Sequence, residues 1–165
     1  MAEPTVEVAD GVVFPQPLPD TAGGVVLGAD GRAFVQFRSP DRPRYPSTWD
    51  VVSGHLEPGE TTLGALAREV FEETGWRLRR VVGNLGRHRW PLDDGEEVGD
   101  FYLIEVEGDL ARPVLERDKH PHSAWFGKED LDRLLVNCAP GDTLIRDVVA
   151  AALSVHNGPT GATPG

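Results

Sequence analysis

Residues 54–76 constrain the fold of this chain more than any other segment, because they combine a loop, a helix start and a helix end. The segment reads GHLEPGETTLGALAREVFEETGW. Gly54 and Gly59 are typical of a loop, and Glu60 followed by two threonines favours a helix start with a hydroxyl cap. Beyond it, side chains recur at helical spacing and predict one buried stripe, and Gly75 is typical of a helix end. The stripe consists of Leu63, Leu66, Ala67, Val70 and Thr74.

Three glutamates fall on one side of this predicted helix. Glu69, Glu72 and Glu73 stand at positions i, i+3 and i+4, so we expect their carboxylates to converge. Three like charges so close repel one another, and without a cation the arrangement only costs stability. Hard divalent ions such as Mg²⁺ or Mn²⁺ prefer an oxygen-only ligand set of this kind. Taken alone, the cluster has a second interpretation as a solvated acidic helix face. The glycine and glutamate upstream, and an arginine beside the cluster, favour a metal site.

The spacing of the segment resembles the signature of the Nudix hydrolase family at every fixed position but the last. The matching positions are Gly54, Glu60, Arg68, Glu69, Val70, Glu72, Glu73 and Gly75. At the last position Trp76 stands in place of the usual aliphatic residue. The resemblance covers about residues 20–155 and implies an α/β fold. This is the Nudix-type α/β/α sandwich with a mixed β-sheet, in which the carboxylates of the motif face a cleft.

The resemblance also implies an activity, the hydrolysis of a phosphoanhydride bond in a nucleoside diphosphate derivative. Mg²⁺, with Mn²⁺ as a substitute, would neutralise phosphate oxygens and activate water. By the same resemblance the catalytic set is Arg68, Glu69, Glu72 and Glu73. The three glutamates would bind the metal, with the carbonyl of Gly54, or of Ser53 beside it, completing the coordination. Glu60 and Arg68 would hold the carboxylates in place.

Candidates for substrate binding lie before the motif. Arg38 ends a predicted strand where relatives often place a phosphate-contacting arginine, and the alternative is a surface charge. Arg42 and Arg44 lie on a proline-rich loop, where either could contact the substrate or be merely solvated. We predict substrate contacts for Arg38 and Arg44. Trp49 could stack on a base, although aromatic residues at strand ends more often serve packing.

A polar stretch before Trp125 contains candidates for a further base or metal ligand. Many relatives carry an additional acidic residue shortly before the matching tryptophan. In this chain the side chains closest to that tryptophan that could act as a base or ligand are His120 and His122, and Glu116 lies further upstream. Any of the three could supply the extra base or ligand, and the alternative is a solvated loop.

The remaining sequence predicts strands interleaved with helices, and hence a mixed sheet flanked by helices. The predicted strands are 23–27, 33–38, 49–52, 77–82, 85–90, 100–107 and 124–126, with at most a short strand at 12–14. Two further helices are predicted at 128–135 and 143–153, and an acidic turn at 91–99. A length of 165 residues suits one domain, at 21–155, preceded by an arm at 1–20 and followed by a disordered tail at 156–165.

Charge and composition limit the partners. A net charge of −11 argues against a nucleic-acid polymer, whose backbone demands a basic surface, but not against a small phosphorylated nucleotide. With Cys138 as the single cysteine, no intrachain disulfide can form, and we expect a half-buried filler there. The chain has no long apolar run and no basic apolar leader, so we expect a cytoplasmic protein without a membrane partner. The sequence leaves open whether the chain forms a homodimer.

Two alternatives to the predicted activity would use the same residues. One is a Nudix-like module that senses a nucleotide without cleaving it. Such domains typically lose motif carboxylates, whereas this chain keeps all of them. The other is a pathway-specific phosphohydrolase, which the sequence does not separate from a general nucleotide pyrophosphatase because variable loops determine specificity.

Overall fold

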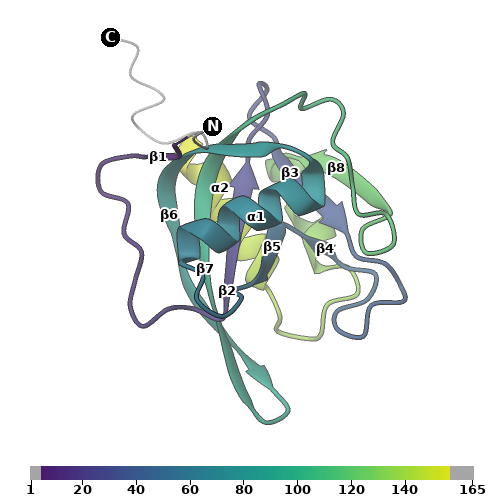
Figure 1. Cartoon of the computed structure of the whole chain (residues 1–165). Coiled ribbons are helices and arrows are strands. Elements are labelled where there is room, and N and C mark those ends of the chain that lie inside the picture. The colour runs from purple at the N-terminus through teal and green to yellow at the C-terminus, as the bar shows by residue number, and fades with distance from the viewer. Residues whose placement is uncertain (1–4, 157–165) are drawn as a thin grey trace.

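The computed structural model describes residues 5–156 and arranges them as two β-sheets between helices (Figure 1). The elements in chain order are β1 (Glu7–Val8), β2 (Thr21–Val26), β3 (Ala33–Phe37), β4 (Trp49–Asp50), β5 (Val52–His55), α1 (Thr62–Thr74), β6 (Arg77–Leu92), β7 (Gly95–Glu107), β8 (His122–Phe126), η1 (Lys128–Leu135) and α2 (Leu144–His156). Apart from His156, the predicted disordered tail lies outside the described residues. No helix among these residues is long and apolar enough to span a bilayer.

The larger sheet has the strand order β1-β6-β7-β2-β5, and the smaller sheet the order β4-β3-β8. In the larger sheet β2 pairs with β7 in parallel and with β5 antiparallel, which confirms the predicted mixed sheet. Helix α1 lies against one face of this sheet, and α2 lies behind it (Figure 1). The central strands are therefore covered on both sides, as their continuous burial requires.

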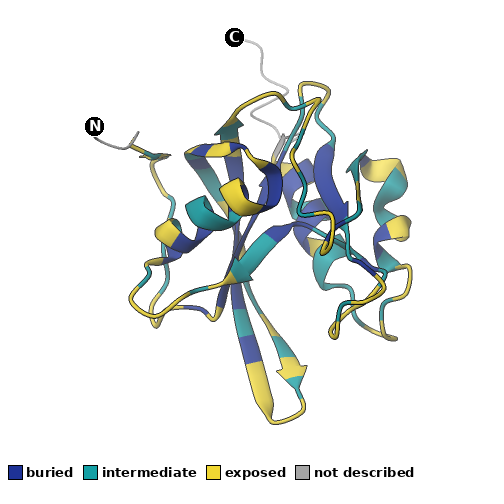
Figure 2. Ribbon diagram, turned by 45° about the vertical axis from the view of Figure 1, so that its right-hand side comes forward, coloured by how far each residue is buried: buried dark blue, intermediate teal, exposed yellow. Residues whose placement is uncertain are grey.

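Two apolar clusters hold these layers together, one on each side of the larger sheet. Leu66 and Val70 of α1 pack with Ala22 and Val26 of β2 on one side. On the other side Val25 belongs to the cluster that α2 and η1 complete. Burial is concentrated where the helices meet the strands, whereas the tip of the β6–β7 hairpin is exposed (Figure 2). Alternate residues of β2 thus anchor opposite layers.

Helix α1 begins and ends at the residues that the sequence indicated. The Thr61 side chain accepts a hydrogen bond from the Gly64 N–H at 3.0 Å, and Gly75 closes the helix with φ of 76°. The unusual Trp76 that follows is 2% exposed and packs edge-on against Phe34, with ring centroids 4.8 Å apart. Its indole N–H donates to the Asp109 carbonyl at 2.9 Å, so the tryptophan fills the core with its polar atom satisfied.

Some predicted boundaries were wrong. The segments 77–82 and 85–90 form one bulged strand, β6, whose register against β7 shifts at three places. The predicted turn at 91–99 is mostly strand, because β6 and β7 continue to a tight turn at Asp93-Asp94. By contrast, the helix predicted at 128–135 has the predicted bounds, and it is a 3₁₀ helix.

The N-terminal arm lies along β6, and its strand is at Glu7–Val8 rather than at 12–14. At the predicted position a side chain replaces strand pairing. The Asn84 side chain accepts from the Val13 N–H at 2.9 Å and donates to the Val13 carbonyl at 2.7 Å. One asparagine thus satisfies both polar groups of a residue that has no neighbouring strand.

Candidate active site

The motif residues meet where β5 leads into the loop before α1. Gly54 in β5 lies directly against the carboxylate of Glu69 in α1, since a Cβ at residue 54 would stand 2.1 Å from the Glu69 Cδ atom. Any side chain at residue 54 would displace that carboxylate. The glycine is therefore required by a close approach of backbone and carboxylate.

Arg68 connects the other motif carboxylates. Its guanidinium donates to both oxygens of Glu60 at 2.8 and 2.9 Å, to Glu69 at 2.7 Å and to Glu72 at 3.2 Å. It also donates to the His55 carbonyl at 2.9 Å, which ties α1 to the end of β5. The hydrogen bonds from Arg68 are the main reason that the pKa of Glu60 falls to about 2. Glu60 is thus held ionised as the support of Arg68.

Glu73 is the most deeply buried of the three clustered glutamates, with 5% of its surface exposed. It accepts hydrogen bonds from the Gln36 side chain at 2.9 Å and from the Ser53 N–H at 3.3 Å. Burial, followed by the neighbouring Glu69 carboxylate, raises its pKa well above the ordinary value. Two carboxyl groups in contact, one of them buried, form a place where a cation would relieve both desolvation and repulsion.

The three glutamates are not gathered into one ligand cage. Glu72 is turned to Arg68 and its side chain is 46% exposed, whereas Glu69 and Glu73 lie together against β5. Among residues 5–156 no three His, Cys, Asp or Glu side chains are already arranged as a metal centre. The donors fit Mg²⁺ or Mn²⁺ by their chemistry, since all are oxygens and two are in contact. Glu72 would have to leave Arg68 to join them.

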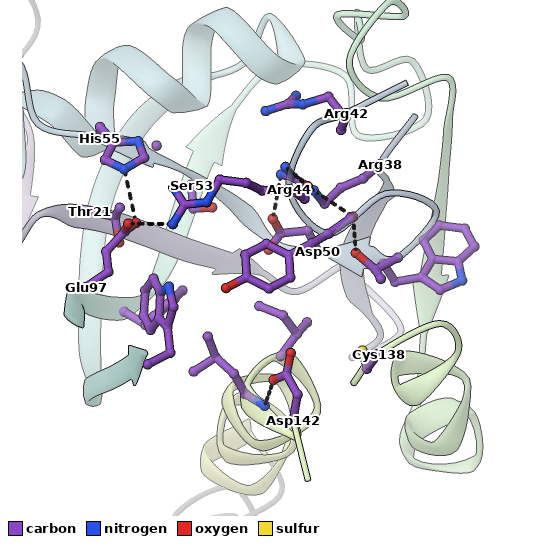
Figure 3. A pocket seen from close by; sticks show the side chains of 18 of the residues that line it. Thr21, Arg38, Arg42, Arg44, Asp50, Ser53, His55, Glu97, Cys138 and Asp142 are labelled. Carbon is purple, nitrogen blue, oxygen red and sulfur yellow. Dashed lines mark hydrogen bonds and ion pairs between the residues drawn. The ribbon is translucent and has the colours of Figure 1, made fainter. Parts of the chain in front are cut away.

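A cavity of about 230 Å³ opens beside these residues (Figure 3). Ser53, Gly54 and His55 of β5 form the part of its lining that joins it to the motif. Four aromatic residues also line it: Tyr45, Trp49, Trp90 and Phe101. Aromatic side chains combined with convergent charged groups in one cavity are typical of small-molecule sites.

Arg38 reaches the cavity, but its guanidinium is already engaged. It donates to the Arg44 carbonyl at 2.7 Å and to the Tyr45 carbonyl at 3.1 Å, and it lies 3.5 Å from an Asp50 carboxylate oxygen. Burial lowers the pKa of Arg38 and raises that of Asp50, while their mutual attraction opposes both shifts. Arg38 therefore holds its own loop in place.

The other two predicted substrate residues also line the cavity. The Arg44 guanidinium lies 3.3 Å from a carboxylate oxygen of Glu97. Trp49 packs edge-on against Phe37 and Phe126, with centroid distances of 5.0 and 4.9 Å, and so serves the core as well. Cys138 lines the cavity too, half-buried as expected, and burial raises the pKa of its thiol.

Glu97 was missed by sequence reasoning. Its side chain is 8% exposed, and it pairs with the His55 ring at 3.0 Å as well as with Arg44. The residue was assigned to an acidic turn, yet it lies in β7 opposite Trp90. A tight turn at Asp93-Asp94 would have placed Trp90 and Glu97 side by side, and that was the available signal.

Of the three candidates before Trp125, only His120 turns inward. Glu116 pairs with Lys119 at 3.7 Å, and the His122 ring lies 6.1 Å from that of Phe37 at the strand surface. His120 is 3% exposed, and burial, then the positive charges of Arg38 and Arg42, lower its pKa to about 4. It is therefore neutral at physiological pH.

Comparison with known proteins shows which family matches this chain. Residues 17–148 match the NUDIX domain family. The chain is 29% identical to the nucleoside triphosphatase NudI of an Enterobacter species, over 68% of this chain and 84% of that protein. It is also 29% identical to the NAD-capped RNA hydrolase NudC of Pseudomonas syringae, over 86% of this chain but only 47% of that protein. Among solved structures, a MutT NUDIX hydrolase from Burkholderia pseudomallei superposes with a TM-score of 0.63 at 24% identity, covering 81% of this chain and 96% of that one.

Proposed function

Because this chain belongs to the Nudix hydrolase family, we propose that it hydrolyses a phosphoanhydride bond of a small nucleotide derivative with the help of Mg²⁺ or Mn²⁺. The observation that carries the proposal is the seating of the Glu69 carboxylate on Gly54, with the buried Glu73 in contact with it. A pair of carboxyl groups in contact must share a proton or bind a cation, and a divalent cation would relieve both their repulsion and the desolvation of Glu73.

Each motif side chain has a separate task in this proposal. Glu69, Glu72 and Glu73 would hold the cation, which when bound supplies charge neutralisation of phosphate oxygens and a lowered pKa of water. Arg68 keeps Glu69 against β5 through its bonds to Glu60 and to the His55 carbonyl. Gln36 and the Ser53 N–H orient Glu73. Such supporting hydrogen bonds fix the ligands before the substrate arrives.

The bond change is a displacement at phosphorus. The oxygen of water forms a bond to one phosphorus, the bridging P–O bond breaks, and its electrons leave with the departing phosphate. The proton of the water goes to a carboxylate, and Glu72 is the most exposed of the three motif glutamates. The relatives named above act on nucleoside triphosphates and on NAD-capped RNA, so the departing group here needs a direct measurement.

The test is a hydrolysis screen, read by chromatographic separation of the nucleotide products, over nucleoside and deoxynucleoside triphosphates, oxidised dGTP, ADP-ribose, NAD, sugar nucleotides and dinucleoside polyphosphates. Each reaction is run with Mg²⁺, with Mn²⁺ and with EDTA. We expect turnover of at least one compound that is lost in EDTA. If no compound is hydrolysed while a nucleotide still binds, the protein is a nucleotide sensor. Turnover confined to one unusual substrate would indicate a pathway-specific phosphohydrolase.

A further inference from the structure

The loop between β3 and β4 brings three arginines to the rim of the cavity. Arg38, Arg42 and Arg44 all line it, and Figure 3 shows their side chains close together above the aromatic part of the pocket. The cavity is also lined by Asp50, Glu97 and Asp142, so the arginines balance the acidic side chains there, although the chain as a whole has a net charge of −11. The three arginines differ in what their guanidinium groups already bind.

Two of these arginines have partners within the protein. Arg38 donates to the carbonyls of Arg44 and Tyr45 and pairs with Asp50. Arg44 is 44% exposed and pairs with Glu97, whose second oxygen is bound to His55. A ligand could reach either guanidinium only in competition with a carboxylate. Neither is a free anion-binding group.

Arg42 differs from both. Its Nη1 atom is buried and has no hydrogen-bond partner, although the residue lines the cavity. Among the described residues the Arg42 side chain has no hydrogen-bond or ion-pair partner that an anion in the cavity would have to displace. In Figure 3 the guanidinium of Arg42 is turned toward the side of the cavity on which His55, the neighbour of Gly54, lies.

The backbone that carries Arg42 is fixed by a turn within its own loop and by one contact that ties this turn to a distant segment. The Arg42 N–H donates to the Ser39 carbonyl at 3.1 Å, and the Asp41 N–H donates to the Ser39 hydroxyl at 3.2 Å. Ser39 itself is buried, and its N–H donates to the Lys119 carbonyl at 2.8 Å. Arg42 is therefore presented from an anchored turn, and its side chain needs less ordering when an anion binds.

A second unpartnered polar atom lies close by. The Nδ1 atom of the buried His120 has no partner, and Arg38, Arg42, Lys119 and Asp118 are the charged groups that act on this ring. Because the ring is neutral at physiological pH, Arg42 supplies the positive charge at this edge of the cavity, and His120 does not compete with it for an anion.

We propose that Arg42 binds the phosphate chain of the substrate, in place of Arg38. This inference rests on the proposed hydrolysis of a nucleotide phosphoanhydride and adds the residue that recognises the anionic part. A guanidinium matches phosphate oxygens with parallel hydrogen bonds, and Arg42 has no carboxylate partner among the described residues that would compete with the phosphate. Arg44 lies at the rim of the cavity and stays paired with Glu97.

The first measurement is steady-state hydrolysis of the nucleotide that the screen shows to be cleaved fastest. Arg42→Ala should lower kcat/KM by about 10²-fold, and Arg42→Lys should recover only part of it, because an ammonium cannot bind phosphate bidentately. Arg79→Ala, an exposed arginine of β6 that pairs with Glu105 away from the cavity, is the matched control and should leave kcat/KM within about twofold of wild type. If Arg42→Ala keeps the wild-type value, or loses no more than Arg79→Ala, the inference is wrong while the proposed function stands.

A second measurement does not depend on hydrolysis. Inorganic pyrophosphate in EDTA should raise the Tm of the wild-type protein and of Arg79→Ala, but not that of Arg42→Ala. Without ligand, Arg42→Ala should melt at or above the wild-type temperature, since it removes a buried unpaired donor. Equal stabilisation of Arg42→Ala and wild type by pyrophosphate, or no stabilisation of the wild type, would overturn the inference even if the screen finds no substrate.

Discussion

The motif region and the loop between β3 and β4 build opposite sides of one site by different means. In the motif, Arg68 binds Glu60, Glu69 and Glu72, all of them within eight residues along the chain. Other contacts join residues far apart along the chain: Glu73 with Gln36 at a separation of 37 residues, and Arg44 of the loop with Glu97 at a separation of 53. The network around Arg68 is thus encoded locally, whereas the position of Glu73 and the contact of Arg44 depend on tertiary structure.

The largest expected effect is at Glu73. The contrast between the two regions fails if Glu73 only supports the fold and does not serve the chemistry. Glu73→Gln keeps the size and the hydrogen bond from the Ser53 N–H but removes the charge that a cation needs. We expect kcat to fall by about 10³-fold or more with a normal melting curve. The matched control is Glu105→Gln, which should retain wild-type kcat. Glu105 is an exposed glutamate of β7 that pairs with Arg79 of β6. A Glu73→Gln variant with full activity contradicts the assignment.

Gly54→Ala tests whether the close approach in the motif matters for chemistry. The added Cβ would meet the Glu69 carboxylate, which must then shift. A shift of about 1 Å in a reacting group can cost about 10²-fold, so kcat should fall to that extent. Gly64→Ala, in the same motif but exposed on α1, should leave kcat unchanged. Equal activities of the two variants would mean that the Gly54–Glu69 contact is dispensable.

The pH dependence of stability tests the surroundings of His120, near the loop between β3 and β4. His120 has a pKa of about 4 against an ordinary 6.5, so between these values the unfolded chain binds a proton that the folded protein does not. The contribution of the neutral His120 ring to the free energy of unfolding is fully present above pH 6.5. It is lost as the pH falls toward 4, by about 3 kcal/mol at most. Urea unfolding of wild type and His120→Gln at pH 4.5 and 7 should show a steeper loss for the wild type. Parallel losses would mean that His120 titrates normally.

The smallest effect concerns the helix cap. Thr61→Ala removes the acceptor of the Gly64 N–H and should reduce the free energy of unfolding by about 1 kcal/mol. For a chain of this size that corresponds to a Tm lower by about 2–4 °C. Because the glutamates keep their spacing, kcat at 25 °C should not change. A parallel loss of kcat would show that the position of α1, and not only its carboxylates, limits turnover.

The extent to which the sequence predicted the structure follows the same division. The limits of α1 were predicted because a threonine cap, a helical stripe and Gly75 are local signals. The union of two predicted strands into β6 was not, since Gly83 and Gly86 at the register shifts are as typical of turns as of bulges. For the site, the spacing of the glutamates indicated their common face, whereas the i,i+4 spacing of Arg68 and Glu72, a local signal for their ion pair, was not used to predict that Glu72 turns to Arg68. The engagement of Arg38 with its own loop and the burial of Glu97 likewise depend on contacts that only the folded chain creates.

The central claim is that Glu69 and Glu73 bind a divalent cation on which hydrolysis depends. The most direct measurement is Mn²⁺ binding, followed by the loss of the free-ion electron paramagnetic resonance signal, on the wild type and on Glu69→Gln and Glu73→Gln, with turnover recorded on the same samples. The account predicts that the wild type binds Mn²⁺ and that turnover rises in proportion to occupancy. It also predicts that both variants lose binding and turnover together while melting cooperatively. Unchanged Mn²⁺ binding in both variants, or wild-type turnover that persists in EDTA, would contradict it.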